Sequence, residues 1–364
     1  KKAQVGDWWD AKGRLRGERQ AGGEAALSAT QEQNKATDTL PAGCENTGRS
    51  QRVRDCKAVT QGAKSKRTQD SKASREDSLQ ALQGAFDNLD AKFEPIPLAN
   101  RLFNEDVRDV VPIGDSHVGL MSWWAETGEN FDLKIAQDMY QRAYARLLVN
   151  ESGASEVALV NLGDYYHSDG GKNATSKNTP VDVDGRWPKV LEVGIEIQIN
   201  AIRTALLAYE KVTVYTLCGN HDGEAAVALR MVLKYAFKDE PRVDIVDSPA
   251  KFQFLEFGEC LIGFTHGDTG KPTDLPLVMA TDRREAWGRT KNWHWYLGHV
   301  HHDTLKDIGP VTVETVRVLV PSDAWHFAAG YRSKRDIKID TWHKVHGRIH
   351  RDTFGISRIM EQRL

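Results

Sequence analysis

The stretch VRDVVPIGDSHVG, residues 107–119, places two polar residues at the end of a short apolar run. The run 107–113 is typical of a buried strand, and Asp115 and His117 follow it, two positions apart. Burying a polar group without a partner costs free energy. Other segments of the chain must therefore supply partners for these two side chains.

The residues around this stretch alternate between strand and helix patterns. We expect strands at 107–113, 156–162 and 211–217, helices at 132–149, 190–209 and 224–237, and then mostly strands, at 252–257, 260–266, 293–300, 311–320 and 352–360. A β-α-β-α-β half followed by a strand-rich half predicts an α/β fold. We expect a sandwich of two mixed β-sheets flanked by helices.

The N-terminal part has a different composition. Residues 1–73 are rich in Gly, Gln, Ser, Thr, Lys and Arg, so we expect a low-complexity arm that is disordered or loosely attached. A helix and connector follow at 74–106, and the main folded domain is expected at 107–364. Lys and Arg outnumber Asp and Glu in the N-terminal arm, whereas the whole chain has a net charge of -2. The arm could hold a polyanion, or it could be a solvated linker.

The cysteines and the hydropathy indicate the compartment. The chain has 4 cysteines and no CxxC spacing, which favours a reducing environment over a disulfide scaffold. No apolar stretch reaches the roughly 18–20 residues of a membrane span. We therefore expect a cytoplasmic protein with no membrane partner. The sequence leaves the oligomeric state open.

Five polar motifs each follow an expected strand: GDSH (114–117), GDYYH (163–167), GNHD (219–222), THGD (265–268) and GHVHH (298–302). In layered α/β proteins, sites form in loops beyond the carboxyl ends of strands. Each motif alone is weak evidence, because a turn with one histidine is common. All five in this order predict one crevice.

The donor atoms in these motifs are carboxylate and amide oxygens and imidazole nitrogens, which suit Mn, Fe or Zn better than Mg or Ca alone. The candidate metal ligands are Asp115, His117, Asp164, Asn220, His266, His299 and His301. Seven groups exceed one tetrahedral site and suffice for two ions that share a carboxylate.

This order of motifs over residues 107–303 resembles the calcineurin-like metallophosphoesterase superfamily, whose pattern is D-x-H, G-D, G-N-H-[DE], H and G-H-x-H. The resemblance implies that Asp115, His117 and His301 hold one ion, that Asn220, His266 and His299 hold the other, and that Asp164 bridges them.

The resemblance also implies a chemistry. Two divalent ions, Mn foremost with Fe, Zn or Mg as alternatives, would supply a hydroxide that attacks phosphorus in a phosphodiester. His221 would face the scissile phosphate and assist the leaving group.

Three segments narrow the resemblance to DNA enzymes. DSHVG and GDYYH are similar to SbcD-type DNA repair exonucleases, in which His167 would be a second catalytic histidine. Residues 321–337 resemble the tail of stand-alone members encoded by phages and prophages. Because little sequence follows the last motif, we expect neither a DNA-capping domain nor an ATPase partner. This implies an exonuclease-like DNA nuclease. A phosphodiesterase of cyclic or dinucleotide signals and an inactive metal-holding binding protein remain alternatives.

Aromatic residues near the motifs could contact a nucleic acid substrate. We expect Trp325, Tyr331 and Trp123 to stack on bases, whereas core packing is the alternative for Trp293 and Trp295. The long polar insert 168–189 follows Asp164, so we expect it to border the cleft.

Overall fold

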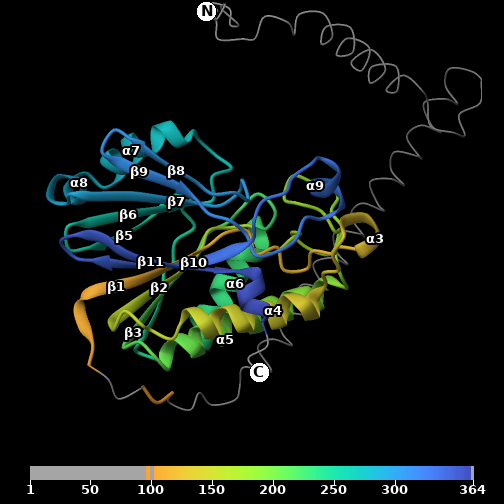
Figure 1. Ribbon diagram of the computed structural model, residues 1–364, viewed down its shortest axis with the longest axis horizontal. Helices are drawn as coiled ribbons and strands as arrows, with labels where there is room; N and C mark the ends of the chain where they lie inside the picture. The colour runs from red at the N-terminus through yellow and green to blue at the C-terminus, as the bar shows by residue number, and fades with distance from the viewer. Residues whose placement is uncertain (1–95, 99–101, 362–364) are drawn as a thin grey trace, which may run out of the picture. The chain divides into compact units, whose positions relative to one another are not determined.

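The computed structural model describes residues 96–98 and 102–361 (Figure 1). The predicted arm, 1–73, and most of the predicted connector, 74–106, lie outside the described residues. The described strands are β1 (Asn104–Ile113), β2 (Ala154–Asn161), β3 (Lys211–Thr216), β4 (Val243–Ile245), β5 (Gln253–Phe257), β6 (Cys260–Thr265), β7 (Asn292–Leu297), β8 (Thr304–Ile308), β9 (Val311–Thr315), β10 (Asp336–His343) and β11 (Gly347–Gly355).

The helices lie mostly between the strands of the first half of the fold. They are α3 (Trp124–Thr127), α4 (Leu133–Leu147), α5 (Trp187–Leu206), α6 (Gly223–Ala236), α7 (Leu275–Asp282), α8 (Arg284–Arg289), α9 (Ala324–Ala328) and α10 (Ile356–Met360), with one 3₁₀ turn at Pro272–Asp274. Among the described residues, no helix is long and apolar enough to cross a bilayer.

The strands form two mixed sheets, which confirms the predicted fold class. The first sheet has the order β11-β10-β1-β2-β3-β4, and the second has the order β5-β6-β7-β9-β8. Strands β1 to β4 run parallel, as do β6, β7 and β9, while β10, β11, β5 and β8 add antiparallel pairs.

Three apolar cores hold these layers together. Helices α4, α5 and α6 cover one face of the first sheet, and α7 and α8 cover the outer face of the second (Figure 1). The third core lies between the sheets, where Val160 of β2 and Phe264 of β6 are fully buried. The parallel strands of both sheets therefore sit face to face in the middle of the molecule.

Two predicted elements need correction. The last predicted strand, 352–360, ends at Gly355, which pairs with the first residue of β10, and the chain continues as α10 because no further strand residue is available for pairing. No helix or strand was predicted between 320 and 352, whereas Trp325 lies in α9. Asp323 starts that helix by accepting a hydrogen bond from the backbone N–H of His326 at 2.7 Å.

Candidate active site

The five motifs meet at the carboxyl ends of parallel strands. Those after β1, β2 and β3 come from the first sheet, and those after β6 and β7 come from the second. Because the sheets face each other, their strand ends bring all seven predicted ligands to one place. Most of them fall into two groups of potential metal ligands.

The first group consists of Asp115, His117 and His301, whose ligand atoms lie within 4.8 Å of one another. Nε2 of His301 lies 3.2 Å from Nε2 of His117 and 3.3 Å from Oδ1 of Asp115. The other Asp115 oxygen, Oδ2, accepts a hydrogen bond from the backbone N–H of His299 at 2.8 Å. Asp115 is fully buried, so this carboxylate is held in a fixed orientation.

The second group consists of Asp164, His266 and His299, and Asn220 adjoins it. Nε2 of His266 lies 3.2 Å from Oδ2 of Asp164 and 3.1 Å from Oδ1 of Asn220. Nδ1 of His266 lies 3.0 Å from the carbonyl oxygen of Leu162, which can only accept, so Nδ1 carries the proton. This leaves Nε2 turned toward the carboxylate and the amide, as in a histidine oriented for a metal.

The residues present fit divalent metal ions. Oδ1 of Asp115 is buried and has no hydrogen-bond partner among the described residues, which is costly unless a cation offsets it. Burial and the neighbouring imidazoles hold the pKa of His117 well below its usual range, so this ring is neutral and can bind a metal. Burial opposes ionisation of Asp164, but the hydrogen bond and charge of His266 lower its pKa to about 2.

The backbone at the ligands is strained. Non-glycine residues with a positive φ are uncommon, and they persist where the surrounding structure enforces them. Apart from three asparagines, every described non-glycine residue with a positive φ is a predicted ligand: Asp115, His117, Asp164, His299 and His301. Strain concentrated on these residues supports a functional origin for their conformation.

Two further histidines, His167 and His221, lie against His117 and form a third donor group with it. The Nδ1 atoms of His167 and His117 lie 3.1 Å apart, and the ring of His221 stacks on that of His167 at 5.4 Å. Burial, followed by the charge of His221, lowers the pKa of His167 to about 3. A neutral His167 can accept a hydrogen bond from Nδ1–H of His117, which leaves Nε2 of His117 for a metal.

His221 presents one nitrogen to the site. Its Nδ1 lies 2.8 Å from the backbone carbonyl of His167 and must therefore be the donor. Its Nε2 lies 3.9 Å from Oδ2 of Asp164. His221 thus touches both the turn after β2 and the predicted bridging carboxylate.

Asp222 was not among the site residues predicted from the sequence. This buried side chain accepts hydrogen bonds from the backbone N–H groups of Asp164, Tyr165, Tyr166 and Gly219, at 2.7–3.2 Å. It therefore joins the turn after β2 to the turn after β3. In the sequence, its position inside the GNHD motif was the signal that could have indicated this role.

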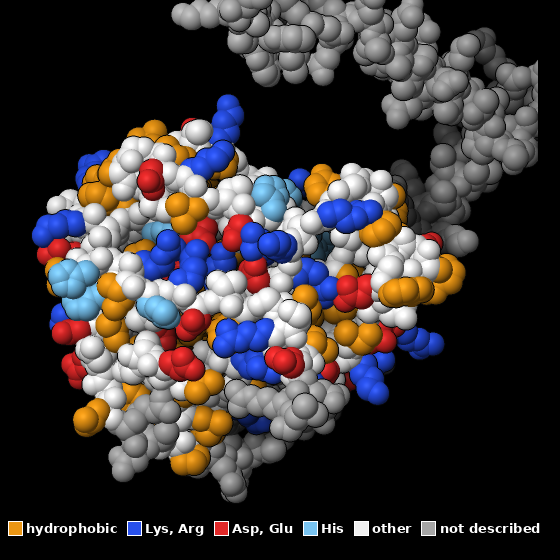
Figure 2. Space-filling view, in the orientation of Figure 1, with side chains coloured by type: hydrophobic (Ala, Val, Ile, Leu, Met, Phe, Trp, Pro, Cys, Tyr) orange, Lys and Arg blue, Asp and Glu red, His pale blue; other side chains and the backbone are white. Residues whose placement is uncertain are grey.

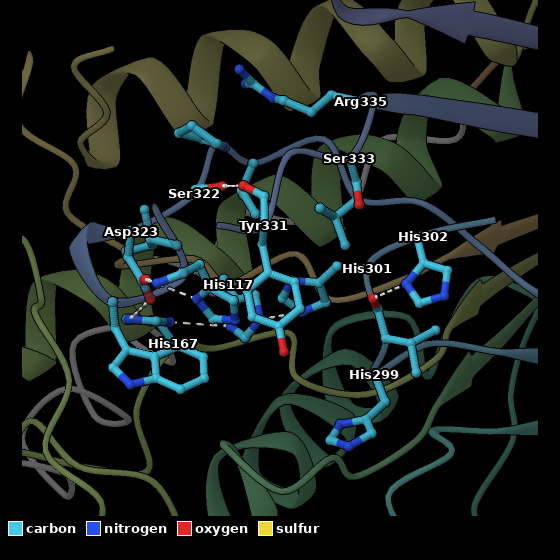
Figure 3. A pocket seen from close by; sticks show the side chains of 17 residues that line it. His117, His167, His299, His301, His302, Ser322, Asp323, Tyr331, Ser333 and Arg335 are labelled. Carbon is cyan, nitrogen blue, oxygen red and sulfur yellow. Dashed lines mark hydrogen bonds and ion pairs between the residues drawn. The ribbon is translucent and has the colours of Figure 1, made fainter. Parts of the chain in front are cut away.

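A pocket of about 390 Å³ adjoins the first donor group (Figure 3). One wall contains His117, His167, His299 and His301, and the other belongs to residues 321–335. Trp325 and Tyr331 line this pocket, as expected of substrate-binding residues.

Other predicted contacts lie elsewhere. Trp123 is exposed at the start of α3 and does not line the pocket, and Trp295 is fully buried in the core. The insert 168–189 contacts the third motif, since the Ser176 N–H donates to the carbonyl of Asn220 at 3.3 Å.

The sequence analysis also missed two residues in the second wall. Asp323 and His326 both line the pocket, and Oδ1 of Asp323 lies 2.8 Å from Nδ1 of His326. Their D-x-x-H spacing at the start of a helix was the only signal in the sequence. It is too common to indicate a site.

Comparison with solved structures returns phosphoesterases among the similar folds. An archaeal phosphodiesterase has 15% identity and a TM-score of 0.33, covering 68% of this chain and 99% of its own. YfcE, a phosphoesterase from E. coli, has 17% identity and a TM-score of 0.34, with 67% and 98% covered. Zinc-bound Vps29 from Entamoeba histolytica has 10% identity and a TM-score of 0.28, with 68% and 99% covered.

No protein-family model and no curated protein matches the sequence. Because all these TM-scores lie below 0.5, the assignment of the site rests on its own geometry.

Proposed function

We propose that this chain is a metal-dependent phosphodiesterase that cleaves nucleic acid, with DNA as the favoured substrate. The observation that carries this proposal is the convergence of seven oxygen and nitrogen donors from five strand ends, one of them a buried carboxylate oxygen without a hydrogen-bond partner among the described residues. Asp115, His117 and His301 would hold one ion, and Asn220, His266 and His299 the other, with Asp164 between them.

Two divalent ions, for which Mn is the first candidate, would polarise the phosphoryl oxygens and supply the nucleophile. The protein's own part is to orient the donors and to handle a proton. His266 is fixed by Leu162, and Asp115 is fixed by the backbone of His299. His221 donates Nδ1–H to the carbonyl of His167, so the second proton of its imidazolium form would lie on Nε2, from which it could pass to a leaving oxygen.

Two features favour a nucleic acid over a small phosphoester. The pocket beside the first donor group carries the exposed rings of Trp325 and Tyr331, and bases stack on such rings with little sequence preference. His167, at the position of a second histidine in the exonuclease pattern, lies inside the site and contacts both His117 and His221.

The deciding experiment is a substrate panel with Mn. It includes bis-p-nitrophenyl phosphate, single- and double-stranded DNA, RNA, cyclic nucleotides and dinucleotides. We expect hydrolysis of the chromogenic diester and of DNA, and loss of both in Asp164→Asn together with a lower bound metal content. Asp282→Asn, an exposed carboxylate on α7, is the matched control.

The outcomes separate the alternatives. Cleavage of cyclic or dinucleotide substrates without cleavage of DNA would replace the nuclease by a signal phosphodiesterase. Metal binding with no hydrolysis of any substrate would indicate a binding protein. A preparation that binds no divalent ion would overturn the proposal altogether.

A further inference from the structure

The second wall of the pocket carries a pair that the proposed chemistry does not use. Asp323 and His326 lie at the start of α9, and the Asp323 carboxylate accepts hydrogen bonds from both the backbone N–H and Nδ1 of His326. Asp323 is buried, with 7% of its surface exposed, so its hydrogen bonds hold the imidazole of His326 in a fixed orientation. Nε2 of His326 is the nitrogen that this arrangement leaves for another partner.

The rings in this wall form a continuous series that starts at the proposed metal centre. His326 stacks on His301, with centroids 5.2 Å apart and planes 23° apart. On its other sides it contacts Trp325 at 4.9 Å and Tyr331 at 5.5 Å. Trp325 is 66% exposed and Tyr331 is 50% exposed, so a ligand can reach both rings.

The segment is tied down at several points, so these rings are held in place. The Tyr331 N–H donates to the carbonyl of His326 at 3.0 Å, and the Ser122 hydroxyl donates to the carbonyl of Ser322 at 3.1 Å. At the end of the segment, Arg335 forms an ion pair with Glu129 at 2.6 Å. The wall therefore does not depend on a ligand for its conformation.

The charges in the pocket limit what it can bind. The guanidinium of Arg335 is already paired with Glu129, so the pocket lacks the free arginine cluster that captures phosphopeptides. What remains is one oriented imidazole beside two exposed aromatic rings. This combination suits a group with a flat aromatic part next to a single phosphate.

We propose that residues 321–335 form a nucleoside subsite, in which Trp325 and Tyr331 stack on a base and Nε2 of His326, oriented by Asp323, faces the adjoining phosphate. The inference rests on the proposed phosphodiesterase function and names the substrate unit that its site would accept. The pocket volume of about 390 Å³ is in the range of small-molecule sites. A nucleotide with its phosphate at His301 would extend outward past His326 to the two exposed rings.

Two chromogenic diesters with the same leaving group test the subsite. The p-nitrophenyl ester of thymidine 5′-monophosphate carries a base, and methyl p-nitrophenyl phosphate does not. In Trp325→Leu and Tyr331→Leu, we expect kcat/KM to fall about fivefold or more further on the thymidine ester than on the methyl ester. Tyr235→Leu, at a comparably exposed tyrosine on α6, is the control.

The pair is tested by His326→Gln and Asp323→Asn. We expect each to raise KM for the thymidine ester with a smaller effect on kcat, since His326 holds the substrate and Asp323 holds His326. Equal losses on both esters, or no loss on either, would overturn the subsite.

A binding measurement keeps the subsite testable if the wild type hydrolyses neither ester, a result that would itself overturn the proposed function. Calorimetric titration with dAMP and with deoxyribose 5-phosphate compares ligands that differ only in the base. We expect tighter binding of dAMP, and loss of that difference in Trp325→Leu and Tyr331→Leu. Equal binding of the two ligands by the wild type would refute the subsite independently of any activity.

Discussion

In the proposed reaction, His221 serves as an imidazole that assists the leaving group without holding a metal. Its Nδ1 is committed to the carbonyl of His167, and its Nε2 lies 3.9 Å from Asp164. We predict that His221→Ala lowers turnover of bis-p-nitrophenyl phosphate about 10²–10⁴-fold, the usual contribution of general acid catalysis. The metal content should remain that of the wild type. His350→Ala, at an exposed histidine on β11, is the control, and loss of metal from His221→Ala would contradict the assigned role.

His167 contacts His117, a proposed metal ligand, so the removal of His167 should affect metal binding through His117. It shares a hydrogen bond with Nδ1 of His117, and such partners of ligating histidines typically contribute about 10–100-fold to metal affinity. We predict that His167→Ala weakens binding of the first ion by about that factor, as measured by metal titration. Unchanged metal affinity with a selective loss of DNA cleavage would instead place His167 on the substrate.

Gly219 shows how closely two motifs approach. A Cβ at this position would lie 1.9 Å from Oδ1 of Asp164 and 2.3 Å from its backbone nitrogen. We predict that Gly219→Ala displaces Asp164, with loss of bound metal and of activity. Gly288→Ala is the matched control, since a Cβ at Gly288 in α8 meets nothing within 4 Å. Full metal binding in Gly219→Ala would show that the turn can shift without cost.

The sequence predicted the candidate metal ligands better than the residues that hold those ligands in place. The candidate ligands could be identified from the sequence because each lies in a short motif that directly follows a strand, as Asp115 follows β1. Asp222 and His326 could not be identified in this way, because their roles depend on contacts with residues that are distant in the sequence. Asp222 accepts hydrogen bonds from a turn that lies far from it in the sequence, and His326 stacks on His301, which follows another strand.

At the scale of elements, the turn after β2 is anchored on α5. The Tyr165 hydroxyl donates to the carbonyl of Gly194 at 2.6 Å, and the Tyr166 hydroxyl donates to that of Leu191 at 3.0 Å. A Cβ at Gly194 would lie 2.3 Å from the Tyr166 ring, so the helix needs a glycine there. This contact sets the distance between α5 and the turn that carries Asp164.

We predict that Gly194→Ala destabilises the protein, although alanine favours a helix by about 1 kcal/mol over glycine. Overpacking of this kind costs about 1–3 kcal/mol, so the net loss should be smaller than that and should be visible in urea unfolding. The same substitution at Gly288 of α8 should not destabilise. A more stable Gly194→Ala variant would mean that Tyr166 moves aside freely.

Strand β10 shows why some elements escaped prediction. Its sequence, DIKIDTWH, carries Lys338 and Asp340, which are not residues expected in a buried strand. Both are buried because charged partners from β9 and β11 reach them, namely Glu314 and Arg351. Hydrophobic pattern alone cannot reveal a strand whose polar residues are paired by distant segments.

At the scale of the whole molecule, Glu314 links the two sheets. It lies on β9 of the second sheet and forms ion pairs with Lys338 of β10 and with Arg348 and Arg351 of β11, both strands of the first sheet. Lysine and arginine side chains gather with acidic ones in the middle of the face in Figure 2. Burial opposes ionisation of Glu314, but the neighbouring side chains of His294 and Arg351 hold its pKa well below its usual range.

This pairing makes stability depend on pH. The folded pKa of Glu314 lies below the unfolded value of 4.5, so its contribution is complete above about pH 4.5 and is lost as the pH falls further. Burial lowers the pKa of His294 below 6.5, so acidification below that value also favours the unfolded state. Both groups therefore predict a free energy of unfolding that falls from neutral to acid pH.

We predict that Glu314→Gln lowers the free energy of unfolding by up to about 3–5 kcal/mol at pH 7, since it leaves buried cations without their charged partner. The difference from the wild type should shrink as the pH is lowered past 4.5. Urea unfolding at pH 7 and pH 4 measures both, with Glu285→Gln on exposed α8 as the control. A difference that is independent of pH would show that Glu314 does not stabilise the fold through its charge.

The division of the ligands between two sheets has a consequence for the lifetime of the protein in a cell. Ions held by side chains from both sheets, as proposed, would bind the folded state alone, so they would add RT ln(1 + [M]/Kd) to its stability. In a metal-starved cell the sheets would separate more often and expose their shared core to proteases. The abundance of the protein would then follow the supply of its ions, even where the rate of synthesis is constant.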